Sequence, residues 1–266
     1  MDKLSEFPSD ASNFNCLISH NELPNSNHVY DLILSKLENV DAALSEAAFY
    51  HFKTPGKMLR AKMAMQSASL AGIDSSIALL WSAAVEVLHN ASLIHDDICD
   101  GDQQRRGRPS LWVKFGQDTA LTLGDWLIAL SFDLASEAAE MSNTPRLVGI
   151  LARHMATTIA GQAMEFRWNS AQSWEVYLKI AADKTAPLLT APIHGVTLMS
   201  RVSGLGYALS GYFCDLGKAY QIANDILNFK GIDGAELIAG DLARRAPNAV
   251  TVSFVESLNS DDYKKF

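Results

Sequence analysis

Four aspartates and three arginines fall within one short run of the sequence, SLIHDDICDGDQQRRGRPS. On a helix, Asp96 and Asp100 are four residues apart and share a face, and Asp97 flanks the same site. Like charges at this spacing destabilise a bare helix, so the cluster indicates a bound cation. Carboxylate oxygens suit Mg²⁺, which often takes one or two carboxylates together with substrate phosphates. A solvated acidic helix end is the alternative, although the preceding residues are apolar.

Arg105 and Arg106 follow the aspartates, and the GRP stretch at 107–109 is expected to end the helix. Guanidinium groups bind phosphate oxygens through paired hydrogen bonds. Metal-binding acids beside phosphate-binding arginines make a site for a diphosphate. On this segment alone, arginines that merely neutralise the aspartates are an equal alternative. Asp102 and Arg108 are assigned no role beyond solvation.

Two further stretches place bases where an anion could bind. TPGKMLRA sets Lys57 and Arg60 three residues apart after Pro-Gly, where a loop leads into a helix and backbone N–H groups are free. ADKTAPL sets Lys184 and Thr185 before Pro187 inside a helical window. A proline there kinks the helix and frees backbone groups.

A second, weaker oxygen cluster occurs late in the chain. YQIANDILN holds Asp225 between Asn224 and Asn228. Its ANDILN has the same shape as HDDICD in the first cluster. Amide oxygens bind Mg²⁺ more weakly than carboxylates do.

Helices must position these groups, because apolar residues recur at helical spacing along most of the chain. The window YDLILSKLENVDAALSEAAFYHF is expected to present one broad apolar face. That face comprises Leu32, Leu34, Leu37, Val40, Leu44 and Ala47 or Ala48. SSIALLWSAAVEVLHNASLIH is apolar all round and predicts a central buried helix. Period-two runs are nearly absent. We therefore expect an all-α fold, with a polar lead-in over 1–25 and one domain over 26–266.

Composition excludes several classes of protein. The chain has 266 residues, 48% hydrophobic and 20% charged, as in a soluble globular protein. A net charge of −8 argues against nucleic acid as a partner. Three cysteines without metal-ligand spacing favour the cytoplasm. We expect no signal peptide, and no transmembrane segment either, because the longest uncharged run, 186–200, is broken by prolines.

With these motifs in view, the sequence resembles the trans-isoprenyl diphosphate synthases, the polyprenyl synthetase family, from about Tyr50 to Asp241. The shared motifs, in the family's order, are PGKMLR, LHNASLIHDDICD with RRGRPS, GDWL, GQAMEF, KTAPL and YQIANDIL. The resemblance implies a single-domain isoprenoid-synthase bundle of roughly ten or more helices, with the two aspartate motifs facing each other across a central cavity. It also implies a homodimer that joins an allylic diphosphate to isopentenyl diphosphate with three Mg²⁺ ions.

The resemblance also assigns residues. The implied metal ligands are Asp96, Asp97, Asp100 and Asp225. The implied pocket for isopentenyl diphosphate comprises Lys57, Arg60, His89 and Arg106. The residues expected around the allylic diphosphate and the developing carbocation are Arg105, Lys184, Thr185 and Gln221. For His89 alone, a satisfied core histidine would be the ordinary interpretation.

Chain length is a further implication of the resemblance. In the family, bulky residues four and five positions before the first motif floor the product pocket. Here Ser92 and Ala91 are small, and Leu88 lies one turn deeper. A small floor favours a product of C20 or longer.

Departures from the family pattern leave alternatives open. The second motif lacks its usual aspartates, and no lysine occurs between Gly231 and Asp241, where the family carries one. Class I terpene cyclases share the fold and often have an Asn-Asp second motif. Their full pattern has a hydroxyl residue at the position of 228 and an acid at that of 232, where this chain has Asn228 and Ile232. We expect a Mg²⁺-dependent chain elongator. The alternatives are a terpene cyclase or a prenyltransferase to another acceptor, and a non-catalytic diphosphate-binding subunit.

Overall fold

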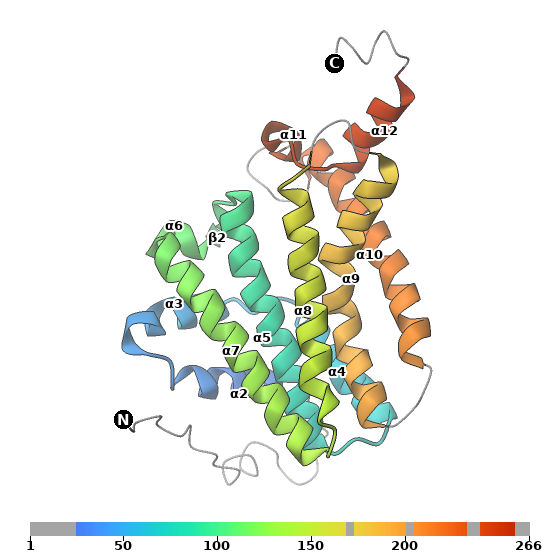
Figure 1. Cartoon of the computed structure of the whole chain (residues 1–266). Coiled ribbons are helices and arrows are strands. Elements are labelled where there is room, and N and C mark those ends of the chain that lie inside the picture. Colours follow the sequence, from blue (N-terminus) through green and yellow to red (C-terminus); the bar gives the residue numbers. More distant parts are fainter. Residues whose placement is uncertain (1–24, 169–172, 201–204, 233–239, 259–266) are drawn as a thin grey trace, which may run out of the picture.

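The computed structural model describes residues 25–168, 173–200, 205–232 and 240–258, and this part of the chain is all-α (Figure 1). Its helices are α2 (Ser26–Leu37), α3 (Ala42–Phe52), α4 (Leu59–Leu70), α5 (Ser75–Asp100), α6 (Leu111–Phe115), α7 (Gln117–Met141), α8 (Arg146–Glu165), α9 (Trp174–Met199), α10 (Leu205–Lys230), α11 (Gly240–Arg244) and α12 (Ala249–Ser257). The strands β1 (Gln104–Arg105) and β2 (Arg108–Pro109) form an antiparallel hairpin. These 11 helices confirm the predicted fold class. The expected lead-in lies outside the described residues except for its last residue.

The bundle is built from long helices that run side by side, with α2, α3 and α6 on one flank and α11 and α12 capping one end (Figure 1). The centre is α5, which is buried on all sides from Ala78 to Leu88. It is long and apolar enough to cross a membrane, but most of its apolar window is buried inside the bundle. It therefore serves as the core helix that the sequence predicted.

Two boundaries differ from the predicted ones. The first window splits into α2 and α3, because Asp41 caps a new helix by accepting a 2.8 Å bond from the Ala43 N–H. Likewise, α5 ends at Asp100 rather than at 107–109. Gly101 takes a left-handed conformation there, with φ +68°, which terminates the helix. The following residues are thereby released to form the hairpin.

Glycines set the close approaches of α9. A Cβ at Gly161 on α8 would lie 2.7 Å from the backbone nitrogen of Lys184, and one at Gly195 would lie 2.2 Å from the ring of Trp81 on α5. The Trp81 indole also donates a 2.8 Å bond to the carbonyl of Pro192. These contacts hold α9 against both α8 and α5, and so fix where Lys184 lies.

Candidate active site

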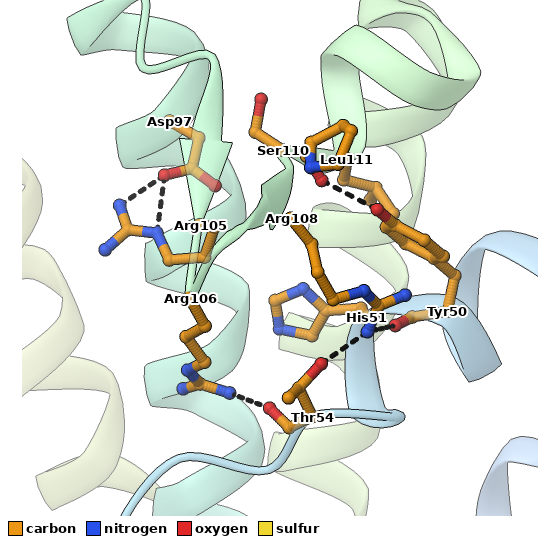
Figure 2. A pocket seen from close by; sticks show the side chains of 10 residues that line it. Tyr50, His51, Thr54, Asp97, Arg105, Arg106, Arg108, Ser110 and Leu111 are labelled. Atoms are coloured by element: carbon orange, nitrogen blue, oxygen red, sulfur yellow. Dashed lines mark hydrogen bonds and ion pairs between the residues drawn. The ribbon is translucent and has the colours of Figure 1, made fainter. Parts of the chain in front are cut away.

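The three aspartates at the end of α5 have different surroundings. Asp96 and Asp100 are partly buried, one helical turn apart. Asp97 is only 2% exposed and accepts a 2.8 Å bond from Nε of Arg105 on the hairpin (Figure 2). The helical spacing predicted a shared face for Asp96 and Asp100. Asp97 instead forms a buried ion pair, and its role as a metal ligand stays a prediction.

Opposite Asp96 and Asp100, α8 and α9 contribute a charged pair. Lys184 on α9 forms an ion pair with Glu165 on α8, both partly buried. Burial alone would lower the pKa of Lys184, but Glu165, Asp96 and Asp100 outweigh it and raise that pKa. Burial raises the pKa of Asp100 to about 6, and Lys184 only partly opposes this. The site thus carries more acid than its cation neutralises.

The hairpin after α5 carries three arginines into one pocket (Figure 2). Its turn has positive φ at Arg106 (+55°) and Gly107 (+73°), the signature of a tight type I′ turn. The guanidinium of Arg108 lies 3.9 Å above the ring of Tyr50 and bonds to Thr54. Arg108 is therefore a structural anchor of the hairpin and not a merely solvated side chain as predicted.

A second cationic cluster consists of Arg60 and Arg106 around His89. The pKa of His89 is well below its ordinary value, because burial and the neighbouring charges of Arg60 and Arg106 disfavour its protonated form. Burial likewise lowers the pKa of Arg60 to about 10. The Nε of Arg60 is buried without a hydrogen-bond partner among the described residues. Such an orphaned donor fits an anionic ligand.

The loop before α4 completes this cluster. Arg106 donates a bond to the carbonyl of Thr54, and a Cβ at Gly56 would lie 2.6 Å from its guanidinium. The backbone thus approaches Arg106 closely only because residue 56 is glycine. Lys57 is exposed two residues before α4. The structure brings Arg60, His89 and Arg106 together, and their role as a pocket for isopentenyl diphosphate stays a prediction.

The second motif lies on α10, and its aspartate is fully engaged. Asp225 is 1% exposed and accepts bonds from the Tyr177 hydroxyl (2.6 Å), the Ala249 N–H (2.7 Å) and the Gln221 amide (2.8 Å). Burial nevertheless raises the pKa of Asp225 to about 6. Asn228 is buried and accepts a 3.3 Å bond from the Asp241 N–H. The role of Asp225 as a metal ligand stays a prediction.

A cavity opens between the first motif, α8, α9 and the segment after α10. Its charged and polar lining includes Asp100, Glu165, Tyr177, Lys184, Gln221, Asp241 and Arg244. Thr185 follows Lys184 on α9 and is partly buried. The helices of both motifs therefore line one cavity: Asp100 comes from α5, and Gln221 from α10.

The residues predicted to set product length lie along α5. Leu88 and Ala91 are fully buried in the helical core, and Ser92 is partly buried. The Ser92 hydroxyl donates a 2.8 Å bond to the carbonyl of His89. Of the three, Ser92 alone retains accessible surface, so any limit on chain length at this level depends first on Ser92.

Two carboxylates of the first motif suit Mg²⁺. Among the described residues, no three His, Cys, Asp or Glu side chains are placed to hold a metal by themselves. Mg²⁺ commonly binds through one or two carboxylates and completes its shell with phosphate oxygens and water. Asp96 and Asp100 fit that arrangement, and burial raises the pKa of both carboxyls, so a cation would relieve unfavourable charge.

Several site residues were missed by sequence reasoning. They are Glu165, Tyr177, Asp241 and Arg244. Glu165 falls in GQAMEF, one of the motifs that occur in the family's order, but no role follows for it from the sequence. The other three lie outside every motif that was given a role, so their positions depend on packing between distant helices.

Known proteins are similar to this chain in sequence. The Polyprenyl synthetase family model matches residues 41–265. A geranylgeranyl diphosphate synthase of Sulfolobus acidocaldarius is 32% identical over 253 residues, 92% of this chain and 76% of that protein. Another, from Saccharolobus solfataricus, is 32% identical over 231 residues, 83% of this chain and 69% of that protein.

Solved structures agree. A polyprenyl synthase from Caulobacter crescentus, crystallised with calcium and isoprenyl diphosphate, superposes with a TM-score of 0.78 at 26% identity, covering 90% of this chain and 79% of that one. The family model spans most of the chain, and the solved structure covers 90% of it. The chain accordingly belongs to the polyprenyl synthetase family, the trans-isoprenyl diphosphate synthases, and is a trans-prenyltransferase.

Proposed function

We propose that the protein condenses an allylic prenyl diphosphate with isopentenyl diphosphate in a Mg²⁺-dependent reaction, and that its product is C20 or longer. The observation that carries the proposal is the presence of two separate cationic regions flanking α5. Lys184 lies opposite Asp96 and Asp100, while Arg60, His89 and Arg106 cluster elsewhere. An elongating enzyme needs two diphosphate pockets, whereas a cyclase needs one.

In this scheme, Asp96 and Asp100 would hold Mg²⁺, which would supply positive charge against the leaving diphosphate. Lys184 and Arg105 contact the same diphosphate and stabilise its departure electrostatically. The amide of Gln221 and the hydroxyl of Thr185 face the cation left on the allylic carbon. The released diphosphate takes the final proton after the isopentenyl double bond has attacked.

The second pocket holds isopentenyl diphosphate. Arg60 offers the buried, unpartnered Nε to its phosphate oxygens, and Arg106 and Lys57 supply further positive charge. Burial first, and then the charges of Arg60 and Arg106, lower the pKa of His89 and keep it neutral, so it acts as a hydrogen-bond donor rather than as a charge.

An assay by gas chromatography of dephosphorylated products tests the proposal. With Mg²⁺, isopentenyl diphosphate and a C10, C15 or C20 primer, we expect longer prenyl alcohols. Asp96→Asn should reduce the rate by about a hundredfold or more. The matched control Asp133→Asn, exposed on α7, should not. Absence of any longer product from the wild-type protein with all primers would refute elongation.

A terpene cyclase is the second candidate, because the second motif opens with Asn224 and Asp225, the Asn-Asp pair that class I cyclases often have. The same assay without isopentenyl diphosphate distinguishes it: cyclised hydrocarbon from one prenyl diphosphate would support the cyclase. A purely non-catalytic subunit is disfavoured by family membership, and turnover by the isolated chain that Asp96→Asn abolishes would exclude it.

We also propose that the protein is a cytoplasmic homodimer. Apolar side chains are exposed on two adjacent long helices, Leu121 (49%) on α7 and Ile159 (55%) on α8, and a second copy could cover them. Size-exclusion chromatography with light scattering tests the dimer, and a monomeric mass at micromolar concentration would contradict it. Fractionation of the source cells tests the compartment.

A further inference from the structure

Arg244 on α11 lies against the end of α5. Its Nη1 donates to the backbone carbonyl of Asp100 at 2.6 Å and to Oδ1 of Asp102 at 3.1 Å. Its Nη2 donates to Oδ1 of Asp241 at 2.9 Å. One guanidinium therefore joins two segments that are more than a hundred residues apart in the sequence.

The contacts continue in both directions from Arg244. On one side, Asp102 lies 3.8 Å from Arg105, which holds the buried Asp97. On the other side, Asp241 accepts a 3.0 Å bond from the amide of Asn248, and that amide also lies 3.4 Å from the backbone carbonyl of Asp225. A continuous polar path thus connects the first aspartate motif with the second, with Arg244 at its centre.

The hydrogen-bond acceptors around residue 244 suit an arginine. Gly101 and Asp102 direct their N–H groups to the carbonyl of Asp97, so the last carbonyl of α5, that of Asp100, is left for another donor. A cation at a helix C-terminus is favoured by the helix dipole. The planar fork of arginine, with its donors fixed in direction, donates to three acceptors on two segments at once.

Arg244 also lines the cavity that holds Lys184 and Asp100. Burial alone would lower the pKa of Arg244, but Asp100, Asp102 and Asp241 outweigh it and raise that pKa. The side chain is about one-third exposed, at 36%, so part of the guanidinium remains open to the cavity.

We propose that Arg244 is a positioning residue that locks the two motif-bearing halves of the site together and thereby sets the affinity of the cavity for a Mg²⁺–diphosphate complex. The identity of the ligand rests on the proposed function; the lock itself does not. Through Arg244, the last turn of α5 and Asp241 are held at a fixed separation across the cavity. The second motif has few carboxylates with which to bind metal ions. The contacts of Arg244 therefore hold the two motifs in place, where metal ions bridging the motifs would otherwise do so.

The test compares Arg244→Gln with Arg245→Gln. Arg245 is the neighbouring residue, is exposed, and is outside the cavity lining, so its loss removes the same charge without the contacts. Calorimetric titration with inorganic diphosphate in Mg²⁺ should show binding about tenfold or more weaker for Arg244→Gln and nearly unchanged for Arg245→Gln. Arg244→Lys, which keeps the charge but not the fork, should restore only part of the affinity.

A metal-free measurement keeps the inference independent of turnover. Amide hydrogen exchange should accelerate at residues 97–102 and 240–244 in Arg244→Gln, and not in Arg245→Gln. Asp102→Asn combined with Arg244→Gln should weaken binding less than the sum of the single changes. Equal diphosphate affinity and equal exchange in both arginine variants would overturn the inference. Should the wild-type protein bind diphosphate, and Arg244→Gln weaken that binding, while no longer product forms, the proposed function fails and the lock stands.

Discussion

The hydroxyl of Tyr177 on α9 donates a 2.6 Å hydrogen bond to Oδ2 of Asp225 on α10, and both groups are almost fully buried. This bond couples the acid of the second motif to the neighbouring helix. Burial is the largest influence on the pKa of Tyr177, and the nearby carboxylate adds to the increase. The phenol therefore stays protonated and acts as a permanent donor to Asp225.

Tyr177→Phe should destabilise the fold by about 1.5–3 kcal/mol, because a buried carboxylate loses one of its donors. Urea denaturation followed by circular dichroism measures the change. Tyr50→Phe is the matched control, since the Tyr50 hydroxyl donates a 2.9 Å bond to the carbonyl of Pro109 at an exposed position. That variant should lose well under half as much. Equal losses in the two variants would contradict a special role for the Asp225 bond.

The local part of the site follows from the sequence. Helical periodicity alone pairs Asp96 with Asp100, since both belong to one unbroken helix that Asp74 caps and Gly101 ends. The same reasoning identified α5 as the buried centre. Local spacing is a reliable guide wherever a single helix carries all the groups concerned.

Contacts between distant segments could not be found in this way. The sequence allowed arginines that neutralise the aspartates, but the choice of Asp97 as the partner of Arg105 depends on the two-residue turn that folds the hairpin back along α5. Glu165 and Lys184 meet because Gly161 admits α9 at close range. These partners depend on turn geometry and helix packing, which no residue spacing encodes.

The Asp97–Arg105 pair offers a second test. Arg105→Met should cost about 3–5 kcal/mol of stability, since it leaves the carboxylate of Asp97 buried and unpaired. Asp97→Asn/Arg105→Met should recover much of that loss, because the buried charge is then removed as well. Guanidinium denaturation of the two single variants and the double variant measures the coupling. Additive losses would show that the two side chains act independently.

The packing of α9 on α5 offers a third. Gly195→Ala should destabilise by about 1–3 kcal/mol or more, because its Cβ would enter the space of the buried Trp81 ring. Gly211→Ala on α10 is the matched control: nothing lies within 4 Å of its added Cβ. It should stabilise by about 0.5–1 kcal/mol through helix propensity. Thermal unfolding monitored by circular dichroism should show a lower melting temperature for Gly195→Ala and a higher one for Gly211→Ala. An unchanged melting temperature for Gly195→Ala would show that the packing around Trp81 adjusts to the added methyl group.

The last test concerns a histidine pair away from the site. Nε2 of His154 on α8 lies 3.1 Å from Nδ1 of His194 on α9. Burial first, and then the charges of His194 and Arg153, lower the pKa of His154 to about 4, and burial also lowers that of His194. One neutral ring donates to the other, and this bond is lost when both are protonated.

A depressed histidine pKa stabilises the folded state above the unfolded value of about 6.5, and this contribution is lost as the pH falls towards about 4. The unfolded chain takes up the proton first in that window. Replacing His154 by glutamine, which can bond but not ionise, should therefore reduce the loss of stability between about pH 7 and about pH 4.5, by about 1–3 kcal/mol. Urea denaturation of both proteins at the two pH values measures the difference. Because Asp100 and Asp225 titrate in the same range in both proteins, comparing the variant with the wild type isolates the histidine contribution. Equal losses of stability in the variant and in the wild type would show that burial does not lower the pKa of His154.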